Sequence, residues 1–317
     1  MRTPSLAALL GLASLFAAVP EALAAPLDGL GRPAVVVPVF ADVEEPLVRI
    51  RASADFAFPC DLDGNRGHTS RQREWLRFEV RRPVDARFTF RFDAEFEHDS
   101  YQFDRPDAIV PGPGRLLEDA FRVWVRPGFD LRLDADWQIG GDIAVTLAGV
   151  PEADMGRATT IGGSFTVRRR FSAGFGLRVG VLVVANLEDE PLIVPILIPD
   201  DGDQISTSRF RFEFRGPAVR AGYALSSAVT AGVTAAYDRR DWRLSKDDRV
   251  PDGILRDLSV PVGLFVEFSP KPNLTIGLEA GANVYQEFEF VDRSGRRVTI
   301  FEAEPAPRAG LSLAWRF

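Results

Sequence analysis

The stretch Arg308-Ala-Gly-Leu-Ser-Leu-Ala-Trp-Arg-Phe317 alternates strictly between two kinds of side chain. The first kind is apolar: Ala309, Leu311, Leu313, Trp315 and Phe317. The residues between them are small or charged: Gly310, Ser312, Ala314 and Arg316. A period of two predicts a β-strand with one apolar and one polar face. The chain therefore ends on an amphipathic strand whose apolar face finishes on an aromatic residue.

The same alternation recurs along most of the chain and predicts about 14 strands, or 12 if strands merge near residues 192–198 and 216–217. Each is long enough for the roughly 9–11 residues that a tilted membrane strand needs. The apolar rows lie at residues 48–56, 78–80, 88–96, 121–125, 131–137, 161–167, 175–183, 192–198, 210–214, 219–225, 229–237, 258–268, 274–284 and 309–317. The pattern predicts an all-β fold, a transmembrane antiparallel up-and-down β-barrel.

The connections between these rows are alternately short and long. Short turns are expected at residues 82–85, 126–128, 168–170, 226–227 and 269–273, and longer polar loops at 57–73, 99–116, 141–157 and 245–256. Short turns at one end and long loops at the other are typical of outer-membrane barrels. An even number of strands would place both ends of the barrel segment on the same side.

The N-terminal residues predict export. Arg2, an apolar run over residues 6–19 and Ala22-Leu23-Ala24 match the three parts of a signal peptide. We therefore expect a signal peptide at 1–24, a periplasmic tail rich in Pro and Gly at 25–46, and an outer-membrane barrel at 47–317. The expected location is the bacterial outer membrane. The expected partners are outer-membrane lipid and the barrel assembly machinery, which would recognise Leu313, Trp315 and Phe317 as an insertion signal.

Composition argues against several other functions. The formal net charge of −7 disfavours nucleic acid as a partner. Cys60 is the only cysteine, so no internal disulfide can form. With 2 His and 1 Cys, no transition-metal site or cofactor is expected. Asp61-Leu-Asp-Gly-Asn65 resembles the start of a calcium loop, but Arg66 and Gln72 stand where glycine and glutamate are needed.

Residues 237–248 and 250–253, the hairpin at 269–274 and the closing stretch 305–317 resemble an uncharacterised, porin-like family of bacterial outer-membrane β-barrels. The resemblance is clear over about the last third of the chain. It implies a barrel fold and an outer-membrane location. It implies no substrate, catalytic residue or other site residue.

Charged residues alternate with the apolar rows, so they are predicted to line the inside of the barrel. The predicted pore-lining residues are Arg49, Arg51, Arg77, Arg81, Arg87, Arg91, Asp93, Glu95, Arg122, Arg132, Asp134, Asp136, Arg178, Arg211, Glu213, Arg220, Glu267 and Glu279. An arginine-rich lining would favour the passage or binding of small polar or anionic solutes. The same residues could instead pair with one another and close a structural or adhesive barrel that transports nothing. The sequence leaves both interpretations open.

A second alternative is a lipid-acting enzyme. His98 and Ser100 share the lipid-facing parity of residues 88–96. Their His-x-Ser spacing resembles that of outer-membrane phospholipases, in which a histidine activates a serine nucleophile. The asparagine that orients the histidine in those enzymes has no counterpart shortly downstream. The prediction is therefore a protein that is not an enzyme.

Overall fold

The computed structural model describes residues 46–172, 175–184, 187, 191–199, 204–206, 209–215 and 218–317. The predicted signal peptide (1–24) and all of the predicted tail (25–46) except residue 46 lie outside the described residues. The described chain is almost entirely strand, which confirms the predicted all-β class. Among these residues, no helix is both long and apolar enough to cross a membrane.

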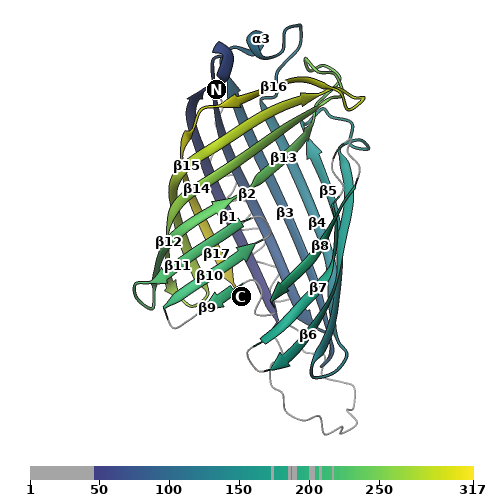
Figure 1. Ribbon diagram of the computed structural model, residues 1–317, viewed down its shortest axis with the longest axis vertical. Coiled ribbons are helices and arrows are strands. Elements are labelled where there is room, and N and C mark those ends of the chain that lie inside the picture. The colour runs from purple at the N-terminus through teal and green to yellow at the C-terminus, as the bar shows by residue number, and fades with distance from the viewer. Residues whose placement is uncertain are drawn as a thin grey trace. The chain divides into compact units, whose positions relative to one another are not determined.

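The strands of the first half are long and follow one another with few interruptions (Figure 1). They are β1 (Leu47–Asp61), β2 (His68–Pro83), β3 (Phe88–Phe103), β4 (Asp119–Arg132), β5 (Trp137–Gly149), β6 (Thr159–Ser172) and β7 (Phe175–Val184). Two short helical turns, η1 (Asp63–Asn65) and α3 (Pro106–Ile109), lie in the connections after β1 and β3.

The second half contains short strands followed by two very long ones. They are β8 (Leu192–Pro199), β9 (Gln204–Ser206), β10 (Phe210–Arg215), β11 (Ala218–Ala224), β12 (Val229–Ala236), β13 (Asp238–Arg243), β14 (Ile254–Lys271), β15 (Leu274–Val291), β16 (Arg297–Ala303) and β17 (Ala306–Arg316).

The sheet is antiparallel and up-and-down, as predicted, and it returns on itself. Strand β1 pairs with β2 on one edge and with the last strand, β17, on the other. Antiparallel pairing runs from β1 through β2 to β8, and from β17 through β15, β14, β12, β11 and β10 to β9. We call this rolled sheet the barrel and its interior the lumen. The Phe317 amide donates to the Val48 carbonyl at 2.9 Å, so the two ends of the barrel meet on the same side, as expected.

The predicted number of strands is wrong, because the described residues form 17 strand segments rather than about 14 or 12. The extra segments arise from interruptions. Strands β12 and β13 lie end to end along β14, and β16 and β17 lie end to end along β15. Strand β9, a three-residue segment beside β10, was not predicted.

The predicted turns need correction at two places. Residues 168–170 are not a turn but lie inside β6, where they pair with residues 176–178 of β7. Residues 126–128 are not a turn but lie inside β4, where Pro127 pairs with Phe92 while the ladder to β5 omits Arg126 and Pro127. A proline has no N–H to give to a ladder, so it is tolerated where pairing on one side is skipped. The true turn is residues 133–136, so the predicted strand at 131–137 is wrong.

Three short turns share one geometry. In residues 84–88 the Asp85 carboxylate accepts hydrogen bonds from the amides of Arg87 and Phe88, at 2.7 and 2.8 Å. Asp134 and Ser226 occupy the same position in residues 133–137 and 225–229. A short polar side chain that caps its own turn fixes the turn locally. These turns, together with residues 272–273, define the turn end of the barrel.

The long connections lie at the opposite, loop end, but they are shorter than predicted. Strand β1 runs to Asp61 and β2 starts at His68, so most of the predicted loop 57–73 is strand. Strand β3 likewise continues to Phe103, and β5 continues to Gly149. The polar residues of these extensions therefore lie in the barrel wall.

The apolar rows face outward, as the alternation predicts. Leu264 and Leu278 are 66% and 60% exposed, whereas Phe265, on the other face of β14, is 5% exposed. Leu313, Trp315 and Phe317 are also exposed, with the rings of Trp315 and Phe317 stacked 5.5 Å apart. The apolar face of the sheet is therefore outside the barrel, and the charged face is inside.

Candidate functional site

The lumen wall in the half nearer the turn end is a ladder of ion pairs between neighbouring strands. Arg126 pairs with Asp93 at 2.8 Å, Arg122 with Glu95 at 2.7 Å and Arg91 with Asp130 at 2.9 Å, all between β3 and β4. Pairs of this kind lie along the wall and do not cross the interior.

Arginine predominates at one point of this wall. The guanidinium groups of Arg49, Arg51 and Arg77 all lie within 3.4 Å of the Glu79 carboxylate. Arg77 and Arg126 also place their guanidinium carbons 5.3 and 4.8 Å from the ring centre of Trp124. Guanidinium groups over an aromatic face are attracted to its electron density. The wall of β1, β2 and β4 is thus rich in arginine.

A second group lies along the wall from β10 to β17 and reaches Asp55 on β1. Arg220 donates to Glu267 at 2.7 Å and stacks on Phe265, with its guanidinium carbon 3.8 Å from the ring centre. Arg211 pairs with Glu213. Arg308 joins Asp55 and Glu279, at 2.6 and 3.2 Å. The predicted residues Arg211, Glu213, Arg220, Glu267 and Glu279 therefore lie inside the barrel.

Three predicted pore-lining residues do not lie on the strands of the wall. Arg87 is in the turn 84–87, and Asp134 and Asp136 are in the turn 133–136, all exposed at the turn end. The alternation of side chains continues through these turns although the strands end, so parity alone misplaces these three residues. Arg81, Arg132 and Arg178 do lie on strands, and among the described residues they form no ion pair.

The half nearer the loop end is crossed by charged side chains. Strands β2 and β3 do not neighbour β13 or β14 in the sheet, so contacts between the two pairs of strands must pass through the interior. We call the residues that meet there the cross-lumen cluster. It comprises Arg71, Arg73, Glu97, Asp99, Tyr101, Asp238, Arg240 and Asp257.

Four contacts of this cluster span the lumen. Arg71 donates to Asp257 at 2.6 Å, and Arg73 to Asp238 at 2.5 Å. Arg240 donates to Glu97 at 2.7 Å, and the Tyr101 hydroxyl to Asp257 at 2.8 Å. Glu97, Asp99 and Asp257 are no more than 1% exposed. Buried charges of both signs within hydrogen-bond distance make this a paired polar layer across the lumen.

None of these eight residues was among the predicted pore-lining residues. Arg71, Arg73, Asp99 and Tyr101 were assigned to loops that prove to be strand, although the parity of Asp93 and Glu95 continues through Glu97, Asp99 and Tyr101. That continued parity was the signal available in the sequence. The partners on β13 and β14 gave no comparable signal.

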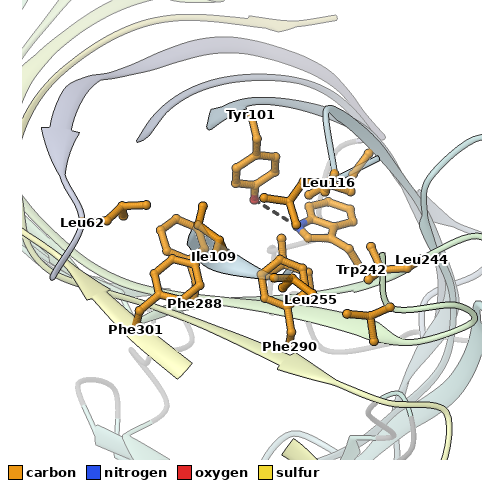
Figure 2. Close-up of a cluster of buried hydrophobic side chains, with 14 of the residues drawn as sticks. Leu62, Tyr101, Ile109, Leu116, Trp242, Leu244, Leu255, Phe288, Phe290 and Phe301 are labelled. Carbon is orange, nitrogen blue, oxygen red and sulfur yellow. Dashed lines mark hydrogen bonds between the residues drawn. The ribbon is translucent and has the colours of Figure 1, made fainter. Parts of the chain in front are cut away.

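An apolar core lies at the loop end and includes Tyr101 of the cross-lumen cluster (Figure 2). Trp242, Leu255, Phe288 and Phe290 are fully buried, and the indole N–H of Trp242 donates to the Tyr101 hydroxyl at 3.0 Å. This hydrogen bond joins the core to the polar layer. Side chains from the connections after β1 and β3, such as Leu62 and Ile109, complete the core.

The loops of this end are also held by polar contacts. Arg249 in the loop 244–253 donates to Asp107 at 2.6 Å, and its amide donates to the Arg115 carbonyl at 3.0 Å. Burial and the nearby Glu152 raise the pKa of Asp248 in that loop, although hydrogen bonds from Ser245 oppose this. The described residues contain no group of three or more His, Cys, Asp and Glu arranged to hold a metal ion.

His98 faces outward, as predicted, and its partner was missed. Its Nε2 lies 3.0 Å from Asp119 at the start of β4, and its ring stacks on Phe121. No hydrogen bond joins His98 to Ser100 within the described part of the chain. The residues thus supply a carboxylate beside the histidine but not the link to the serine that a nucleophile requires.

Comparison with known proteins gives structural neighbours only. No protein-family model and no curated protein matches the chain. An outer-membrane channel of Pseudomonas putida F1 is similar at 10% identity and a TM-score of 0.42, covering 92% of this chain and 99% of its own. The P. putida toluene transporter TodX is similar at 7% identity and a TM-score of 0.38, covering 86% and 90%. The translocator domain of the autotransporter NalP of Neisseria meningitidis is similar at 10% identity and a TM-score of 0.32, covering 98% of each. Similarity of this degree does not establish a shared function.

The class of protein follows from the chain's own architecture. An antiparallel up-and-down sheet that returns to its first strand, with an apolar exterior, a charged interior and short turns at one end, is a β-barrel of the outer-membrane type.

Proposed function

We propose that this protein is a porin-like outer-membrane barrel whose lumen favours small anionic solutes. The convergence of Arg49, Arg51 and Arg77 on the single carboxylate of Glu79 carries the proposal. Arg77 also lies 3.9 Å from Glu95, so the three guanidinium groups form a patch rather than isolated charges. A ring or patch of arginine in a pore selects for anions. The apolar exterior supports insertion in lipid.

The test is ion selectivity in planar bilayers under a salt gradient. We expect the sign of the reversal potential to report preference for the anion. Arg51→Gln should move the reversal potential toward the cation, and Arg209→Gln, which changes an exposed arginine at the turn end, should not. Cation preference in the unmodified protein would refute the proposal.

A second candidate is a closed structural barrel, and the cross-lumen cluster favours it. Its buried ion pairs and the apolar core obstruct the loop end. This candidate predicts that liposomes carrying the unmodified protein do not swell with small sugars or small anions. Swelling with the unmodified protein would reject it.

A further inference from the structure

We propose that β13, together with the loop 244–253 that follows it, is the movable part of a gate at the loop end of the lumen. The proposal rests on the proposed function, because a gate has meaning only if solutes use the lumen. It assigns Glu97, Arg240 and Asp238 as gating residues, which hold β13 across the interior.

Strand β13 is attached to the wall on one side. All six of its residues pair with β14, from Asp238 opposite Ser259 to Arg243 opposite Ile254. Within the described part of the chain, its only other strand partner is β5, through the single bridge between Arg243 and Gly149. A strand with one full ladder and one single bridge can leave the second partner without losing the first.

The point where β13 meets β12 is interrupted. Tyr237 lies between the two strands and belongs to neither. On β14, Val260 and Pro261 lie between the ladder with β12 and the ladder with β13. Proline cannot donate to a ladder, and the register of β14 with β15 also shifts between Val260 and Pro261. Hinges are found at such ends of elements, where few backbone hydrogen bonds resist a change in direction.

Two buried polar groups at this level have no partner. Among the described residues, neither Ser259 Oγ nor Asn283 Oδ1 forms a hydrogen bond, and both residues are 1% exposed. Ser259 pairs with Asp238, and Asn283 pairs with Pro261, so both lie beside the hinge. A buried polar group without a partner disfavours the closed state, and water entering an open lumen would satisfy it.

The first half of β13 is held by groups that water can replace. Arg240 reaches Glu97 at 2.7 Å and Arg73 reaches Asp238 at 2.5 Å, whereas Trp242, near the end of the strand, packs in the apolar core. Hydration of the separated charges offsets much of the cost of parting them, whereas separating an apolar contact has no such compensation. Charged contacts therefore suit an interface that opens and closes.

The experiment is single-channel recording of the full chain in planar bilayers. Glu97→Gln weakens the hold on Arg240, and we expect it to raise the fraction of time open by about tenfold or more. The matched control is Asp93→Asn, which removes a carboxylate of the wall pair with Arg126 and should leave gating unchanged. Ser259→Ala removes an unsatisfied group from the closed state and should lower the open fraction. It stands as the second variant if Glu97→Gln does not fold.

A crosslink supplies the reverse test. Arg115 and Asp248 form a bridge between the loop 104–118 and the loop 244–253. In a Cys60→Ser background, Arg115→Cys with Asp248→Cys should hold the gate closed when oxidised and release it when reduced. Unchanged opening in both Glu97→Gln and the oxidised crosslink would overturn the gate. In that case, anion-selective current in the unmodified protein would still support the proposed function. Gated current without anion preference would support the gate and refute the proposed anion selectivity.

Discussion

Arg243 and Gly149 meet across the top of the barrel although they lie on β13 and β5, which are not consecutive in the sheet. The Val150 amide donates to the Arg243 carbonyl at 2.9 Å, and a Cβ placed on Gly149 would lie 2.7 Å from that carbonyl oxygen. The contact therefore requires glycine at this position. It joins the two sides of the loop end above β7 to β12, which are shorter than β5.

Gly149→Ala should consequently push β13 away from β5. Forcing an extra carbon into a filled contact costs about 1–3 kcal/mol. We expect a lower midpoint of thermal unfolding and faster proteolysis in the loop 244–253, measured on protein in detergent. Gly156→Ala, where the nearest atom is an aspartate oxygen at 3.2 Å, is the control and should behave like the unmodified protein. Equal proteolysis of both variants would contradict a role for this contact.

The hydroxyl of Tyr101 links the apolar core to the cross-lumen cluster. It accepts from Trp242 at 3.0 Å and donates to Asp257 at 2.8 Å. Tyr101→Phe leaves a buried N–H and a buried carboxylate short of a partner, so we expect a loss of about 1–3 kcal/mol in the free energy of unfolding. Tyr223→Phe removes a hydroxyl whose contact with Arg209 is exposed, and should change stability far less. Similar losses in the two variants would show that the buried hydrogen bonds of Tyr101 add no more to the free energy of unfolding than the exposed contact of Tyr223.

The sequence predicts the side chains that line the lumen near the turn end better than those that cross it near the loop end. Arg49, Arg51 and Arg77 lie on strands whose alternation is unbroken, so their inward direction follows from parity alone. The cross-lumen contacts depend on which strands lie opposite each other, and no local pattern encodes that. Asp238 and Asp257 find Arg73 and Arg71 more than a hundred residues away in the chain.

The turn at residues 133–136, where the alternation predicts a strand, is explained by the chemistry of its first residues. Val84-Asp85 and Leu133-Asp134 begin the same kind of turn, and the first was placed nearly correctly because Pro83 precedes it. The second has no proline or glycine, and the alternation of Leu131 and Leu133 continues into it. The capping carboxylate of Asp134 ends the strand there, and its parity looks like that of a lumen residue.

The lipid-facing pair His98 and Ser100 permits a direct test for enzyme activity. Because Asp119 occupies His98 Nε2 and no hydrogen bond joins the histidine to the serine, we expect no release of fatty acid from phospholipid vesicles. The measurement is a lipase assay with the purified protein, with and without calcium. Release that disappears in Ser100→Ala but persists in Ser70→Ala would reverse this expectation and make His98, Ser100 and Asp119 a catalytic group.

The turn at residues 84–88 should give stability that depends on pH. The amides of Arg87 and Phe88 donate to Asp85 and hold the pKa of its carboxyl below the ordinary value. A lowered folded-state pKa means that the contribution is complete above the ordinary aspartate pKa and is lost as pH falls through the folded value. The thermal midpoint should therefore differ most between the unmodified protein and Asp85→Ala at neutral pH, and the difference should shrink in acid. Ser226→Ala removes a hydroxyl that caps the same geometry without titrating, so its effect should not vary with pH. A difference for Asp85→Ala that persists unchanged in acid would mean that the carboxylate charge is irrelevant to the turn.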